Sequence, residues 1–207
     1  MFALVESGSI TKMMNGNRGI TIGDNQYPAS FFTTVYSEAE RNAVGVYTIE
    51  IDETNKKDSS WYNNTAITYA YDSSANKVKG TYGTATAKAH ADSTYTNTDK
   101  SNGDIPAGKD VGDVKDEGLK TILIRQVKQE AQGILNQTDW YVVRKADTDE
   151  AIPSNVATHR AAVRTKQASM ETAITNAADT PALETLYTYT TTDGVTSRPL
   201  GELPTLE

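Results

Sequence analysis

The side chains that most often carry catalysis are present in this sequence without a catalytic spacing. The chain of 207 residues has two histidines, His90 and His159, and no cysteine. Thiol nucleophiles, disulfides and cysteine–zinc sites are therefore excluded. Neither a Gly-x-Ser-x-Gly nucleophile motif nor a phosphate-binding loop occurs. Asp52 and Glu53 are neighbours, so on a strand they would point to opposite faces and form a poor catalytic pair. We predict that the protein is not an enzyme, with no catalytic residue and no cofactor.

The acidic side chains of the middle of the chain raise the question of a metal site. Oxygen ligands for calcium are available there from Asp104, Asp110, Asp113 and Asp116. Their spacing does not match a calcium-binding helix–loop–helix, so the sequence favours a solvated acidic loop and no metal. His90 lies at the edge of this segment and is expected to be solvated. His159 falls among apolar positions of a helical pattern, where a packing role is favoured over a ligand role.

Charge and hydropathy exclude further classes of partner. The net charge is −7 and 37% of the residues are hydrophobic. A general nucleic-acid binder would carry the opposite charge, and the apolar runs are shorter than a membrane span requires. The first residues lack a basic stretch followed by an apolar one, so no signal peptide is expected. We predict neither nucleic-acid binding nor membrane insertion.

The candidates that remain are residues for protein–protein contact. In Thr138-Asp139-Trp140, the indole either covers the open end of a helical hairpin or is an exposed interface anchor. Arg160 and Arg164 share a helix face, from which they either clamp carboxylates such as those of Asp139 or Glu130 or are solvated. Near a short helix, Phe31, Phe32 and Tyr36 are further interface candidates: in a strand, one of the two phenylalanines faces the core and the other needs a cover.

A glycan-binding role is a second candidate, and it could coexist with the first. Trp61, Tyr62, Tyr69 and Tyr71 are close in sequence, and in a strand Tyr69 and Tyr71 share one face. Aromatic side chains of this kind can stack on sugars. The alternative, which the sequence favours, is that they form the half-buried face of a hairpin.

The pattern of elements predicts an α+β fold: a small N-terminal β-rich domain with one short helix, followed by a C-terminal αα-hairpin and an extended tail. Four segments are expected, namely a β-rich domain over 1–90, a polar acidic linker over 91–117, a helical hairpin over 118–180 and an extended arm over 181–207.

Local signals place the elements within these segments. Ser37 and Glu40 fit a capping box that opens a short helix ending near Gly45. Alternation predicts strands over 20–22, 46–51 and 78–86, and a hairpin that joins 61–62 to 67–71. Apolar residues recur at helical spacing from Leu119 to Ile134 and again from Val156 to Ala177. Between these helices, 141–144 is expected to be extended, and the tail is expected to turn at Asp193-Gly194.

Two stretches resemble bacteriophage proteins. The run ITIGDNQYPASFF over 20–32, followed by SEAERNAVGVY over 37–47, resembles a module common in structural proteins of marine bacteriophages. The second stretch comprises Arg125-Gln126, the segment from Gly133 to Arg144 with Thr-Asp-Trp, Ile152-Pro153, and His159-Arg160 with Arg164. It is similar to the C-terminal region of phage tail-fibre and tail-fibre-assembly proteins, with His159 and Val163 in place of the usual tyrosine and leucine.

The resemblance implies a virion structural protein of the tail, baseplate or fibre attachment, located in the virion tail region and assembled in the host cytoplasm. Its partners would be other virion proteins and further copies of itself in a symmetric assembly, and a host surface glycan is a further candidate. The alternatives are a tail-fibre assembly factor that is absent from the mature particle and a capsid decoration protein.

Overall fold

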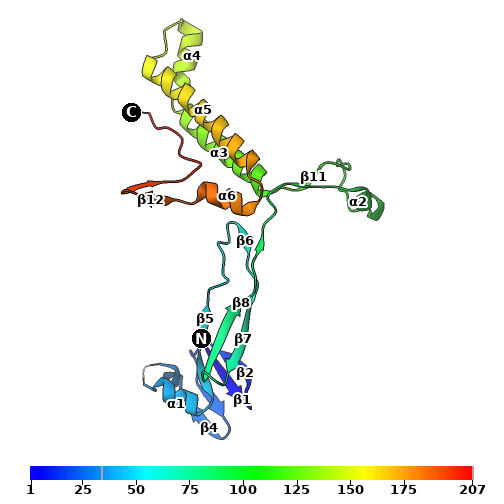
Figure 1. Ribbon diagram of the computed structural model, residues 1–207, viewed down its shortest axis with the longest axis vertical. Helices are drawn as coiled ribbons and strands as arrows, with labels where there is room; N and C mark the ends of the chain where they lie inside the picture. The colour runs from blue at the N-terminus through cyan, green and yellow to red at the C-terminus, as the bar shows by residue number, and fades with distance from the viewer. Residues whose placement is uncertain (34, 207) are drawn as a thin grey trace. The chain divides into compact units, whose positions relative to one another are not determined.

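A computed structural model describes residues 1–33 and 35–206, and it divides the chain into two compact units, 1–86 and 87–207. Strands dominate the first unit and helices the second (Figure 1). The α+β prediction is confirmed. Position 207 of the predicted C-terminal arm lies outside the described residues.

The first unit is built on a mixed five-stranded sheet in the order β2-β1-β5-β8-β7. Its elements, with their bounds, are β1 (Phe2–Glu6), β2 (Ser9–Met14), β3 (Ile20–Ile22), β4 (Asn25–Tyr27), the 3₁₀ helix η1 (Ala29–Phe32), α1 (Glu38–Ala43), β5 (Val46–Asp52), β6 (Tyr62–Asn63), β7 (Ile67–Asp72) and β8 (Lys77–Tyr82). The neighbours pair antiparallel except β5 and β8, which run parallel.

The predicted capping box is confirmed, because the Ser37 hydroxyl accepts from the Glu40 N–H while the Glu40 carboxylate accepts from the Ser37 N–H.

Two predictions for this unit are wrong. The partner of β7 is β8 and not the segment around Trp61, since a turn after Asp72 closes a β7–β8 hairpin. In that turn the Asp72 carboxylate accepts from the N–H groups of Ser74 and Ala75, and Asn76 adopts a φ of 52°. The predicted strand over 78–86 ends at Tyr82.

The second unit is an antiparallel helical hairpin with additions. After β9 (Thr86–Ala87) at the boundary come β10 (Ser93–Thr94), α2 (Asn97–Asn102), β11 (Val114–Asp116), α3 (Leu119–Asn136), α4 (Asp139–Thr148), α5 (Ser154–Asn176), α6 (Thr180–Tyr187), β12 (Thr190–Thr192) and β13 (Val195–Ser197). The predicted pairing of two long helices is confirmed, because α3 packs against α5. Their buried side chains follow the predicted stripes and include Leu123, Val127, Val163, Met170 and Ile174.

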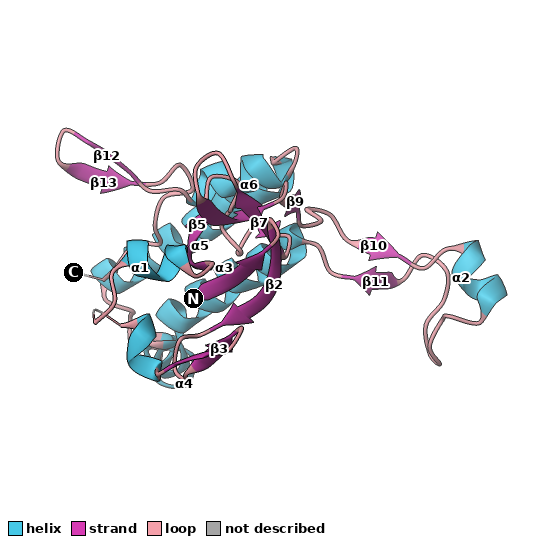
Figure 2. Ribbon diagram, turned by 90° about the horizontal axis from the view of Figure 1, so that it is seen from below, coloured by secondary structure: helices cyan, strands magenta, loops and turns pink. Residues whose placement is uncertain are grey.

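Three predictions for the second unit need correction. The predicted linker contains an antiparallel pair, β10 with β11, that carries α2 (Figure 2). The segment 141–144 is helical within α4 and not extended. The predicted arm begins with helix α6, because the Asp179 carboxylate accepts from the Ala182 N–H as an N-cap and Pro181 suits the first helical turn.

The excursion from 91 to 117 is closed at its base by the start of α3. Gly118 N–H and the Thr121 hydroxyl both donate to the Asp92 carboxylate, at 2.7 and 2.9 Å. The next two helical N–H groups donate to the carbonyls of Ala89 and His90. A remote aspartate and two backbone carbonyls thus satisfy the first turn of α3, where sequence reasoning found no cap.

Candidate functional site

Helix α4 presents a group of exposed apolar side chains around Trp140. In α4, all ten residues of which are described, no side chain is buried. Trp140 is 53% exposed and Val143 65% exposed, and Val142 is also exposed. Of the two alternatives for Trp140, the structure therefore shows the exposed indole and not a cover for the end of the hairpin. A helix without a buried face is stabilised only weakly by its own packing.

The exposed aromatic group of α4 is nevertheless held in place. The rings of Trp140 and Tyr141 lie 3.9 Å apart between centroids. The Arg144 guanidinium sits 4.8 Å from the centroid of Trp140 and 5.3 Å from that of Tyr141, within cation–π range. Arg144 also forms an ion pair with Glu150 at 3.0 Å. A rigid aromatic anchor of this kind is typical of the centre of a protein interface.

Arg160 fixes the start of α4 from the neighbouring helix α5. Its buried guanidinium donates to the Leu135 carbonyl at 2.6 Å, to the Thr138 hydroxyl at 2.7 Å and to the Asp139 carboxylate at 2.8 Å. The predicted clamp on Asp139 is present. Because the side chain is buried, its role within the described chain is to join α3, α4 and α5, not to reach a partner.

Arg164 lies one turn further along α5, and its side chain is exposed. This side chain forms no hydrogen bond or ion pair with any residue that the structure describes. With Gln167, Ala168 and Glu171 it lines a shallow groove beside α3 that is open to solvent. Of the two predicted arginines, Arg164 is the one that remains available to a partner.

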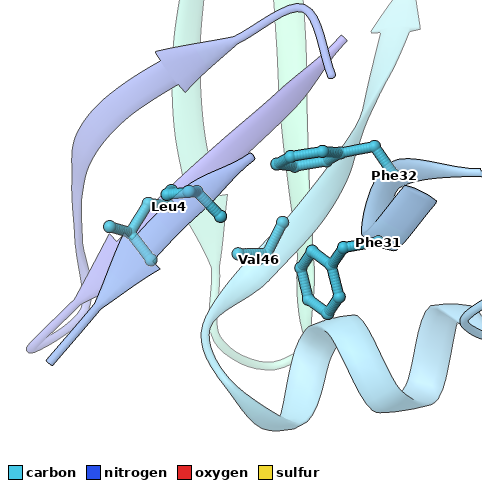
Figure 3. Close-up of a cluster of buried hydrophobic side chains, with 5 residues drawn as sticks. Leu4, Phe31, Phe32 and Val46 are labelled. Carbon is cyan, nitrogen blue, oxygen red and sulfur yellow. The ribbon is translucent and has the colours of Figure 1, made fainter. Parts of the chain in front are cut away.

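The three aromatic candidates near α1 are core residues. Phe31 and Phe32 are both buried, and they pack with Leu4, Ile20 and Val46 (Figure 3). The expectation that one of them needs an external cover assumed a strand; the 3₁₀ turn η1 points both inward instead. The Tyr36 ring packs edge-on against Phe31 at 5.0 Å and is half-buried.

The glycan candidates are also packed within their unit. Trp61 is buried. Tyr69 and Tyr71 share a face of β7 and pack against the core cluster of Ala3, Tyr47, Ile49 and Val78. The Tyr71 hydroxyl lies 3.2 Å from that of Tyr47, and both donate to the Asn76 side chain at 2.9 Å. The half-buried hairpin face is therefore the interpretation that the structure supports.

The titratable groups serve local structure. Over the residues it describes, the structure brings no three His, Asp or Glu side chains together in a way that could hold a metal ion. Asp113 accepts from the Asp110 N–H, a turn contact. Lys115 and the capping hydroxyl of Thr96 hold the pKa of Asp99 far below its usual range. His159 is buried, with Nε2 3.0 Å from the Pro204 carbonyl.

No known protein family model matches this sequence, and no curated protein or solved structure matches it either. Among the described helices, none combines the length and apolar character that a membrane span requires.

Proposed function

We propose that the protein is a non-enzymatic structural component of a bacteriophage virion, located at the tail, baseplate or fibre attachment, and that it acts through protein–protein interfaces. The observation that carries the proposal is α4, a helix with no buried residue and an ordered, exposed Trp140. An exposed apolar helix face of this kind is expected to be covered by a partner. The resemblance of the same segment to phage tail-fibre proteins supports a virion partner.

The first test is quantitative proteomics of purified particles, referenced to the major capsid protein. A copy number of a small ring, such as three, six or twelve, supports the proposal. Hundreds of copies indicate a capsid decoration protein, and absence from the particle indicates an assembly factor.

A second test asks whether α4 is the contact surface. Trp140→Ala should leave the fold intact, because the side chain is exposed, and should lower incorporation into particles by tenfold or more, since a central aromatic anchor contributes about 2 kcal/mol or more to an interface. Gln129→Ala, on α3, is the matched variant for an exposed side chain outside α4. Normal incorporation of the Trp140 variant would contradict a role of α4 in assembly.

A further inference from the structure

The β12–β13 hairpin is a two-stranded ribbon with two open edges. Its strands pair in unbroken register, Thr190 with Ser197, Thr191 with Thr196 and Thr192 with Val195. The turn residues Asp193 and Gly194 have φ of 52° and 80°, as a tight two-residue hairpin turn requires. All six strand residues are described, and every one is exposed.

Of the usual protections of an edge strand, this ribbon has only the shortness of its strands, which are three residues long. Other natural edges carry lysine, proline, a bulge or a covering element. Between 189 and 197 the sequence has no lysine, arginine or proline, and Asp193 in the turn is its one charge. Val195 is 66% exposed. The β10–β11 ribbon differs, because its register is shifted between Ser93 and Thr94 and it carries Lys115 and Asp116.

The base of the ribbon is braced, so the open edges are held in place. The Arg198 guanidinium lies 5.2 Å from the ring centroid of Tyr187 and 5.3 Å from that of Tyr189. Glu202 accepts from Arg198 at 2.8 Å and from the Tyr189 hydroxyl at 2.6 Å. A fixed strand loses less conformational entropy on pairing than a mobile tail does.

The hairpin geometry identifies the free backbone groups. Thr192 and Val195 flank the two-residue turn and form its hydrogen-bonded pair. Thr191 and Thr196 are therefore a non-hydrogen-bonded pair, which agrees with the 2.8 Å contact between their hydroxyls. It follows that the N–H and C=O of Thr191 point away from β13 toward solvent.

We infer that β12 is a pairing edge for β12 of a second copy of this chain, antiparallel and centred on Thr191. A two-fold axis at Thr191 lets each Thr191 N–H donate to the Thr191 carbonyl of the other copy, so the contact is self-complementary. This register sets Asp193 of one copy opposite Tyr189 of the other, on whose ring Arg198 rests. The one charge of the ribbon thus faces the Arg198–Glu202 ion pair and not an isolated charge of the same sign.

The role of this pairing in an assembly rests on the proposed function, because a contact of three residues per strand is weak by itself and is detected in solution only when a disulfide traps it. A symmetric assembly that already holds copies close together raises their effective concentration and makes a weak pairing productive.

Cysteine trapping tests the register in the full-length protein, which has no cysteine of its own. Thr190→Cys and Thr192→Cys, mixed in equal amounts at high protein concentration and oxidised, should give mainly the mixed disulfide dimer. The register sets position 190 opposite position 192 of the other copy as a close, non-hydrogen-bonded pair. We expect the mixed dimer to exceed either homodimer by fivefold or more. A statistical mixture of dimers, or none, would overturn the pairing.

Two variants complete the test. Adding Thr191→Pro to both cysteine variants removes an N–H that the hairpin does not use. It should abolish the mixed dimer while the circular dichroism spectrum stays unchanged. Thr94→Cys, in the β10–β11 ribbon, measures non-specific oxidation. Particle proteomics is independent of these results: a chain found in particles without the selective disulfide refutes the pairing alone, and one absent from particles refutes the virion role alone.

Discussion

Arg160 shows how a single residue acts in this protein. It is buried, and its three acceptors lie on the end of α3 and the start of α4. Arg160→Ala removes a buried side chain together with its three hydrogen bonds, so we expect the free energy of unfolding to fall by about 2–3 kcal/mol. Arg164→Ala, one turn away and exposed, should change it by less than about 0.5 kcal/mol. Denaturant unfolding of both variants measures the difference, and equal effects would contradict the clamp.

The raised pKa values of two tyrosines predict how the stability of the protein changes at alkaline pH. The hydrogen bond to Tyr71 and burial raise the pKa of Tyr47 to about 12, and burial raises the pKa of Tyr187 to about 12. The ordinary value is 10.0. A raised pKa means that the fold favours the neutral hydroxyl. The free energy of unfolding is therefore unaffected below pH 10 and falls as the pH rises from 10 toward 12, because these tyrosines already ionise in the unfolded chain.

Absorbance titration at alkaline pH measures this effect. We expect Tyr47 and Tyr187 to ionise late, together with Tyr189, whose pKa is raised by its hydrogen bond to Glu202. Tyr47→Phe should remove one late ionisation. Ionisation of all tyrosines in a single transition near pH 10, with the fold retained, would argue against these shifts.

At the scale of elements, α3 has one glycine inside it and one at its N-cap, and they have opposite roles. Gly133 lies inside the helix, and a Cβ there would meet nothing within 4 Å. Gly133→Ala should therefore stabilise the protein by up to about 1 kcal/mol through helix propensity. At Gly118, where α3 begins, a Cβ would lie 2.3 Å from the backbone of Ala91, so Gly118→Ala should destabilise it. Thermal unfolding of the two variants should shift in opposite directions, and shifts of the same sign would be inconsistent with this packing.

In helix α4, the observed structure differs from the one that the local sequence pattern predicts. Trp140, Tyr141, Val142 and Val143 favour strands by propensity, and the sequence predicted an extended segment. The helix forms because Asp139 is anchored by Arg160 at its start and because Arg144 and Lys145 pair with Glu150 and Asp149 at its end. The contact at the start depends on Arg160 of α5, which the local sequence of α4 does not include.

At the scale of the whole molecule, each unit buries apolar side chains of its own, among them Phe31 and Val46 in the first and Val163 and Ile174 in the second. We expect residues 87–207, expressed alone, to keep the helical circular dichroism of the full chain and to unfold cooperatively. The fragment 1–86 is its counterpart and should keep a β-type spectrum. An unfolded fragment 87–207 would show that its helices need the first unit.

The sequence by itself determined the α+β class, the two long helices, the capping box at Ser37 and the turn at Asp193-Gly194. These features depend on periodicity and on contacts within a few residues, so the local sequence is enough to predict them. Only the tertiary structure decided that Phe31 and Phe32 are core, that Trp140 is exposed, that Arg160 is buried and Arg164 free, and that Asp92 caps α3 from 26 residues away. Burial and long-range pairing depend on which elements meet, and single-sequence patterns do not specify that.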